Sequence, residues 1–141
     1  DINPDAIENT KANVKKHNLT KKINVLQSDI FSSLKESEKF STIFWNIPFG
    51  YLEKDNLSLV EKSVFDTKYK DTKRFIDESK KYLKKNGRLL IGFSTTIGRF
   101  DLLKKYLKNN NFQFKIISET TAPEGNPMGP IKVELIEAKL R

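Results

Sequence analysis

The chain has 141 residues, of which 37% are hydrophobic and 31% are charged, and its formal net charge is +8. This length suits a single domain with its own apolar core. With no cysteine and one histidine, disulfides and cysteine-ligated metals are excluded, and a zinc enzyme or a catalytic triad is not expected. No apolar run approaches the roughly 18 residues that span a bilayer, so we expect a cytoplasmic protein that does not enter membranes.

The excess of positive charge is compatible with two explanations. It favours a nucleic-acid partner, because phosphates attract basic surfaces. However, only four of the 26 basic residues are arginines, and lysines occur in every predicted helix, as in chains with a general compositional bias. Charge alone therefore leaves both explanations open.

The first predicted helix runs from Pro4 to Lys16. Asn3 suits the N-cap, and proline is well tolerated at the first helical position. The preceding Asp1 is typical of the end of a strand. Residues 23–27 contain β-branched side chains and predict a second short strand.

Asp29 and Ile30 follow that strand closely. A carboxylate at this point commonly caps a helical turn, here the one predicted at residues 32–34. The alternative, a role in ligand binding, depends on the resemblance described below.

The central strand is predicted over residues 40–45, which are apolar, β-branched and aromatic, and we expect it to be buried. Polarity changes at its end, where Asn46 is followed by Ile47, Pro48 and Phe49. The asparagine amide both donates and accepts hydrogen bonds, the proline stiffens the backbone, and the phenylalanine supplies a flat ring. We expect a site for a planar group with an amino hydrogen, because α/β sheets bind ligands at the carboxyl ends of strands.

Residues 50–70 are too numerous for a simple connection. A short helix is predicted near residues 55–62, with Asp55 as its cap. This segment is either an element that grips the substrate or a variable surface insertion.

The rest of the chain continues the alternation of helices and strands. Periodicity predicts a helix over 71–85, a buried strand beside the central one over 88–93, a helix over 98–109, and strands over 112–116 and 131–135. The last two strands are joined by a turn-rich loop at 121–130, which makes them antiparallel. The apolar phase shifts at 136–140, which predicts a bulge or burial on both faces.

The run Asn46-Ile47-Pro48-Phe49 resembles the Asn-Pro-Pro-Phe/Tyr signature of S-adenosylmethionine-dependent methyltransferases that modify planar nitrogens. Their targets are exocyclic amines of nucleic-acid bases and the glutamine side-chain amide. The resemblance implies that Asn46 and the Ile47 carbonyl accept hydrogen bonds from the target amine, and that Phe49 stacks on its plane. Ile47 replaces the usual first proline, which keeps the carbonyl acceptor and loses the rigidity of the ring.

Two further motifs resemble the same family and imply S-adenosyl-L-methionine as cofactor. By this resemblance Asp1 accepts hydrogen bonds from the cofactor ribose, Asp29 contacts the adenine amine, and Ile30 packs near the ring. Asn46 then lies beside the methyl donor.

The implied fold is an α/β, Rossmann-like methyltransferase sheet, mostly parallel, with a C-terminal antiparallel hairpin. In the family pattern a first strand and a glycine-rich loop precede the position of Asp1. We therefore expect residues 1–141 to form a partial methyltransferase domain that binds the cofactor poorly by itself. Without that strand, the sheet is expected to have a gap lined by apolar residues.

The expected function is methyl transfer to a planar nitrogen of a macromolecule, with a nucleic acid, the ribosome or a translation protein as partner. The first alternative is a non-catalytic, methyltransferase-like domain whose altered site at Ile47 binds protein or RNA. The second is a nicotinamide-dinucleotide-binding domain, although the terminal hairpin argues against it.

Overall fold

The computed structural model describes residues 1–121 and 129–141. The chain divides into two compact units, Asp1–Lys35 and Glu36–Arg141. The smaller unit is one helix with a long irregular segment, and the larger unit contains all the strands of the described residues.

Helix α1 (Pro4–Lys16) begins as predicted. The Asn3 side chain accepts a hydrogen bond from the Asp5 N–H at 3.0 Å and so caps the helix. Lysines lie in the last turn, where the helix dipole favours positive charge.

The strand predicted over residues 23–27 does not form. This irregular segment nevertheless runs beside the start of the chain, because the Ser28 N–H donates to the Asp1 carbonyl at 2.9 Å. The Asp1 amino group in turn donates to the Leu26 carbonyl at 3.3 Å. These bonds join the two segments without extending into a regular ladder.

The larger unit is built on a four-stranded sheet in the order β1-β4-β6-β5. Its strands are β1 (Phe40–Asn46), β4 (Leu83–Phe93), β5 (Phe112–Thr121) and β6 (Lys132–Leu140). The α/β class with a C-terminal antiparallel hairpin is confirmed, since β6 runs antiparallel to both β4 and β5. Within this sheet β1 and β4 form the parallel pair, and the early segments expected to add parallel strands contribute none.

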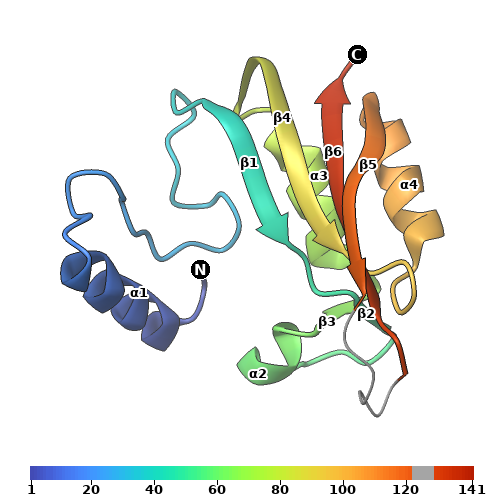
Figure 1. Ribbon diagram of the computed structural model, residues 1–141, viewed down its shortest axis with the longest axis horizontal. Helices are drawn as coiled ribbons and strands as arrows, with labels where there is room; N and C mark the ends of the chain where they lie inside the picture. The colour runs from blue at the N-terminus through green and yellow to red at the C-terminus, as the bar shows by residue number, and fades with distance from the viewer. Residues whose placement is uncertain (122–128) are drawn as a thin grey trace. The chain divides into compact units, whose positions relative to one another are not determined.

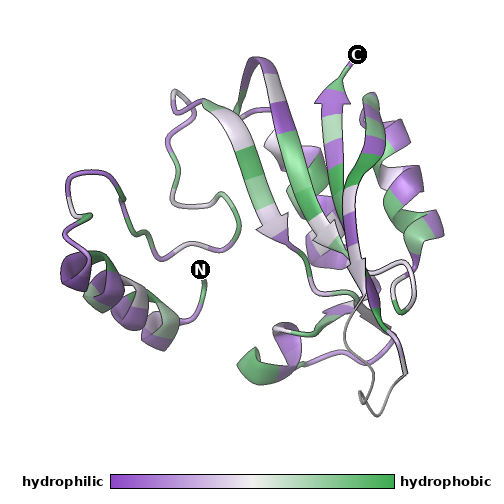
Figure 2. Cartoon of the chain, viewed as in Figure 1, coloured by the Kyte–Doolittle hydropathy of each residue, from purple (hydrophilic) through white to green (hydrophobic). Residues whose placement is uncertain are grey.

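Helices α3 (Lys70–Ser79) and α4 (Phe100–Asn109) cover one face of this sheet (Figure 1). Side chains alternate along a strand, so every second residue of β4 and β6 faces these helices. The fully buried core comprises Tyr69, Ile76, Leu89, Ile91, Phe93, Leu103, Leu107, Ile136 and Ala138. Figure 2 shows apolar residues along the middle of β1 and β4, where the sheet is packed.

Strand β1 is buried on one face only, which corrects the prediction of a buried strand over 40–45. Ile43 is buried, and Trp45 packs against Phe75 of α3 with ring centroids 4.8 Å apart. Phe44 points to the opposite face and is 62% exposed. β1 is an edge strand of this sheet, and the helices of the larger unit cover only one of its faces.

The helix predicted over 71–85 ends earlier, at Ser79. Tyr82 and Leu83 fit helical spacing, but the Phe40 N–H donates to the Tyr82 carbonyl at 2.7 Å, and Leu83 pairs with Phe40. Pairing with β1 therefore overrides the local periodicity. No helix in the described part of the chain is long and apolar enough to cross a membrane.

Residues 50–70 form a small substructure. Its elements are β2 (Gly50–Leu52), α2 (Leu59–Lys62) and β3 (Phe65–Thr67), and β2 pairs with β3 in parallel. The cap of α2 is Ser58 and not Asp55, because Ser58 and Glu61 form a reciprocal capping box. The backbone bond from Ser58, together with Lys54, lowers the pKa of Glu61 to about 2.

The terminal hairpin shows both features that the phase shift predicts. The register shifts between Ile116 and Ser118 of β5, which marks a bulge. Residues 136–138 of β6 are all buried, so both faces of that strand are covered there. Most of the turn-rich loop predicted at 121–130 lies outside the described residues.

Asp66, in strand β3 of the substructure at residues 50–70, caps α3. Its carboxylate is almost fully buried and accepts hydrogen bonds from the Asp71 N–H at 3.2 Å and the Thr72 N–H at 2.7 Å. Tyr69, at the N-cap position itself, makes no side-chain cap. Asp66 therefore satisfies donors that the helix start would otherwise leave open, and burial raises its pKa.

We expect Asp66→Ala to lower the free energy of unfolding by about 1–3 kcal/mol, because buried N–H groups lose their acceptor. Urea denaturation followed by circular dichroism measures this change. Asp55→Ala is the matched control, since its ion pair with Lys70 is exposed and contributes below about 1 kcal/mol. Equal losses in the two variants would contradict the capping role.

Candidate active site

The candidate site lies where β1 and β4 end. These strands are parallel, so their carboxyl ends meet at one edge of the sheet, and Asn46 is paired with Gly92. The next residue continues this pairing, because the Ile47 N–H donates to the Gly92 carbonyl at 3.3 Å. The acceptor corner (Asn46–Phe49) therefore begins in contact with β4.

Gly92 leaves the space in which the Asn46 amide lies. A Cβ atom at position 92 would stand 2.3 Å from Asn46 Oδ1, a separation that real Cβ atoms do not reach. Only glycine leaves this space to the amide. Asn46 is exposed, and its side chain has no hydrogen-bond partner among the described residues, so its donors and acceptor are open to a ligand.

Ile47 is 1% exposed as a whole residue. The bulk that replaces the family's proline is therefore buried in the core, and the backbone carbonyl is shielded from solvent with it. Within the described residues that carbonyl accepts no hydrogen bond. Pro48, which follows, is half-buried.

Phe49 is held from two sides. Its ring meets Phe93 edge-on, with centroids 6.3 Å apart and an interplanar angle of 79°. Its carbonyl accepts a hydrogen bond from the Tyr69 hydroxyl, which also accepts one from the Arg99 N–H at 2.9 Å. Burial raises the pKa of this tyrosine, so the hydroxyl stays protonated and able to donate.

The segment after β4 is fixed by a buried carboxylate on β6. Glu134 is 2% exposed and accepts hydrogen bonds from the Thr95 N–H at 3.0 Å and from the Thr95 hydroxyl. The Ser94 hydroxyl donates to the Lys132 carbonyl at 2.6 Å. Two neighbouring strand ends at this edge of the sheet, those of β1 and β4, are therefore held by backbone and side-chain bonds.

The sequence did not identify Gly92, Tyr69 or Glu134. The glycine carried a weak signal, because glycine inside an apolar strand often marks a close approach of another group. Tyr69 lies in the long segment 50–70 and Glu134 in the strand predicted over 131–135, and no local motif marks either residue. Both become functional candidates only when the sheet brings distant segments together.

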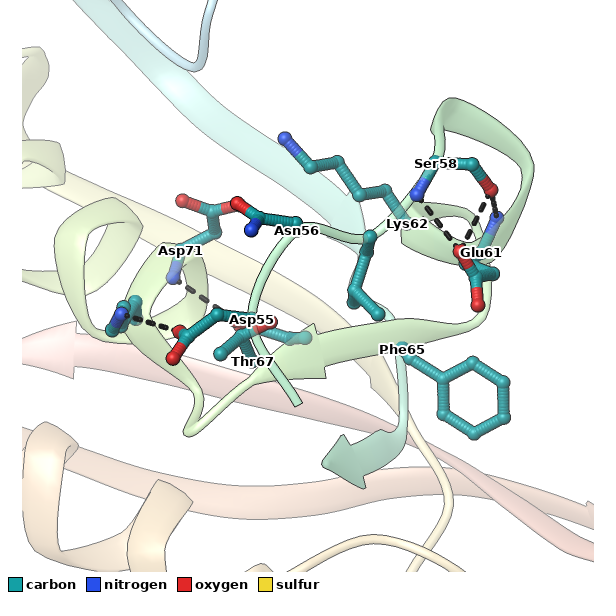
Figure 3. Close-up of a pocket in the computed structure, with 11 residues that line it drawn as sticks. Asp55, Asn56, Ser58, Glu61, Lys62, Phe65, Thr67 and Asp71 are labelled. Carbon is teal, nitrogen blue, oxygen red and sulfur yellow. Dashed lines mark hydrogen bonds and ion pairs between the residues drawn. The ribbon is translucent and has the colours of Figure 1, made fainter. Parts of the chain in front are cut away.

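A pocket is lined mainly by residues of the substructure at 50–70 (Figure 3). Its lining consists of Asp55, Asn56, Leu57, Ser58, Glu61, Lys62, Phe65, Asp66, Thr67, Lys70 and Asp71. Several of its polar groups already have structural partners: Glu61 pairs with Ser58 and Lys54, and Asp66 caps α3. The carboxylates of Glu61 and Asp66 therefore have structural roles in this pocket. The acceptor corner, whose Asn46 amide has no such partner within the described residues, is the better candidate for an active site.

The smaller unit brings together the other site candidates. The Asp1 carbonyl accepts from the Ser28 N–H, so Asp1 and Asp29 occupy neighbouring positions, and both residues are exposed. Ile30 is half-buried and has a φ of +52°, a left-handed conformation that is costly for a β-branched residue. Carboxylate acceptors beside an apolar side chain have the chemistry to bind a ribose and an adenine.

Each set of candidates is thus assembled within its own unit. Asp1, Asp29 and Ile30 belong to Asp1–Lys35, and the acceptor corner belongs to Glu36–Arg141. Among residues 1–121 and 129–141 no group of His, Asp or Glu side chains is arranged to hold a metal ion.

Comparison with known proteins identifies the family of the chain. A family model described as methyltransferase small domain matches residues 1–117. The ribosomal protein uL3 glutamine methyltransferase of Francisella tularensis subsp. tularensis (strain SCHU S4 / Schu 4) is 31% identical over 101 residues. That match covers 64% of this chain and 31% of the relative, so the chain spans about a third of the relative's length.

Solved structures show likeness of fold. The ribosomal protein L11 methylase from Lactobacillus delbrueckii subsp. bulgaricus matches with a TM-score of 0.65 at 14% identity, covering 100% of this chain and 56% of that one. The tRNA m1G37 methyltransferase of M. jannaschii matches with a TM-score of 0.62 at 20% identity, covering 100% and 36% of the two chains. Both chains are longer than this one.

The Gly92 contact predicts a double-mutant coupling. We expect Gly92→Ala to turn the exposed Asn46 amide into another rotamer, at a cost of about 0.5–1.5 kcal/mol in the free energy of unfolding. In an Asn46→Ala background this cost is expected to disappear, since the next atom, Asn46 Cα, stands at 3.4 Å, an ordinary contact distance. Urea denaturation of the four proteins of the cycle measures the coupling, and additive effects would refute it.

Proposed function

Because the chain belongs to the methyltransferase small domain family, whose members are S-adenosylmethionine-dependent enzymes, we propose that it methylates a planar nitrogen of a macromolecule. The observation that carries this proposal is the exposed Asn46 amide. It lies over Gly92 at the end of β1 and has no partner within the described residues. An open amide at this place matches the chemistry of an amine acceptor site.

In the proposed reaction the acceptor corner orients the target. The Asn46 side-chain oxygen accepts one hydrogen of the target amine, and the Ile47 carbonyl accepts the other once substrate binding uncovers it, which fixes the plane and direction of the amine. The same oxygens stabilise the positive charge that grows on the nitrogen as it is methylated. Phe49 stacks against the planar group, and S-adenosyl-L-methionine supplies an electrophilic methyl group when it is bound.

The cofactor residues proposed from the smaller unit are Asp1, Asp29 and Ile30. The Asp1 carboxylate already accepts the Asn3 N–H at 2.8 Å through one oxygen, which leaves acceptor sites for ribose hydroxyls. Asp29 has the acceptor needed for the adenine amine, and Ile30 supplies an apolar surface for the ring. In the larger unit, Asn46 is the residue proposed for the methyl-transfer end of the cofactor.

The glutamine side-chain amide of a translation protein is the first candidate substrate. It is supported by the 31% identical relative, which is named as a ribosomal protein glutamine methyltransferase. A base amine of RNA or DNA is the second candidate, supported by the formal net charge of +8. Both candidates are components of cytoplasmic translation or nucleic-acid metabolism, so we assign the protein to the cytoplasm.

In the full-length protein we expect Asn46→Ala to reduce methyl transfer at least about 100-fold, because an acceptor that acts on the growing charge is lost. The cofactor Kd is expected to stay within about twofold, since other residues bind the adenosine part. Transfer of labelled methyl groups and calorimetric titration measure the two quantities. The control is Asn13→Ala, because Asn13 is an exposed residue on α1. Undiminished transfer by Asn46→Ala would show that the site is elsewhere.

The substrate class is decided by labelling. Full-length protein, incubated with tritiated methyl donor and either ribosomal proteins or purified ribosomal and transfer RNA, is expected to label protein. Acid hydrolysis is then expected to yield labelled methylamine, which is released from an N-methylated glutamine amide. Label in the RNA fraction alone would select the second candidate.

A further inference from the structure

The Tyr69 hydroxyl joins segments that are distant in the sequence. Tyr69 is 0% exposed and lies between β3 and α3. Its hydroxyl donates to the Phe49 carbonyl in the acceptor corner and accepts from the Arg99 N–H at 2.9 Å, just before α4. One side chain therefore links the segment after β1, the start of α3 and the segment after β4.

The Tyr69 ring also supports the aromatic groups of the site. It meets Tyr51 edge-on at 5.4 Å between centroids, and Phe93 at 6.4 Å. Phe93 in turn contacts the Phe49 ring at 6.3 Å. On the outer side, the Arg99 guanidinium lies 5.5 Å from the centre of the Tyr51 ring. The proposed stacking ring thus belongs to a connected aromatic cluster.

The backbone at Tyr69 is in a costly conformation. Lys68 and Tyr69 have φ values of +52° and +51°, in the left-handed region that non-glycine residues seldom adopt. A residue at the N-cap position commonly bonds its own helix, but Tyr69 makes no such bond, and Asp66 provides the cap instead. This arrangement frees the tyrosine side chain to reach the acceptor corner.

We propose that Tyr69 is a positioning residue for the acceptor corner, which fixes the Phe49 backbone and thereby the plane on which the target nitrogen stacks. This inference rests on the proposed function and deepens it. Its effect is specific to the target, because the hydroxyl bonds Phe49 and Arg99 and makes no bond to the smaller unit.

The test is Tyr69→Phe in the full-length protein, which keeps the ring and removes both hydrogen bonds. We expect the KM for the methyl-accepting substrate to rise about tenfold, through lost alignment of the stacking ring, while the cofactor Kd stays within about twofold. Exchange of the Arg99 amide hydrogen, followed by NMR, is expected to accelerate, because its acceptor is gone. The matched control is Tyr106→Phe on α4. The Tyr106 hydroxyl has no hydrogen-bond partner within the described residues.

A second pair of variants gives the same test without altering the buried ring. Arg99 has a φ of −78°, which proline adopts, and Arg99→Pro replaces the N–H that bonds Tyr69 with a ring carbon that also displaces the Tyr69 hydroxyl. Arg99→Ala removes the same side chain and keeps that N–H. We expect the KM for the substrate to be several-fold higher in Arg99→Pro than in Arg99→Ala.

The outcomes separate this proposal from the proposed function. Kinetics are compared well below the unfolding temperature of each variant, so that lost stability alone does not change KM. An unchanged KM in Tyr69→Phe, with transfer abolished in Asn46→Ala, overturns the positioning role and keeps the acceptor site. Equal weakening of cofactor and substrate binding also overturns it, because that result indicates general damage. If Asn46→Ala retains transfer, the proposed function fails, and Tyr69 is then a structural anchor only.

Discussion

The structure depends on the close approach of Asn46 to Gly92 at the ends of two parallel strands. Because Gly92 has no side chain, the exposed amide has room to lie directly over the β4 backbone. This contact uses none of the hydrogen-bonding capacity of the amide. Its donors and acceptor are therefore left for a ligand, which those of a hydrogen-bonded amide are not.

The acceptor corner is organised entirely within the larger unit. Its direct contacts come from β4 and from residues that begin α3 and precede α4, all of them after Glu36. The proposed cofactor residues form a separate group in the smaller unit. Orientation of the target nitrogen and recognition of the adenosine part are therefore assigned to different parts of the chain, each with its own local bonding.

The sequence predicted those features whose causes are local. Asn3 caps the helix that follows it, and the change of polarity at Asn46 marks the end of β1, because each signal lies within a few residues of its effect. Prediction failed where distant pairing decides: Tyr82 and Leu83 leave the helical pattern to pair with Phe40. Gly92, Tyr69 and Glu134 were missed for the same reason, since the partners of each are far along the chain.

Burial of Ile47 has a thermodynamic consequence. A proline would stiffen the backbone at this position by covalent geometry, which hardly changes with temperature. The isoleucine instead is fixed through its contacts in the core, with 1% of its surface exposed. Apolar burial carries a large heat capacity and weakens on cooling, so the order of the backbone at residue 47 depends on temperature in the same way as the core does.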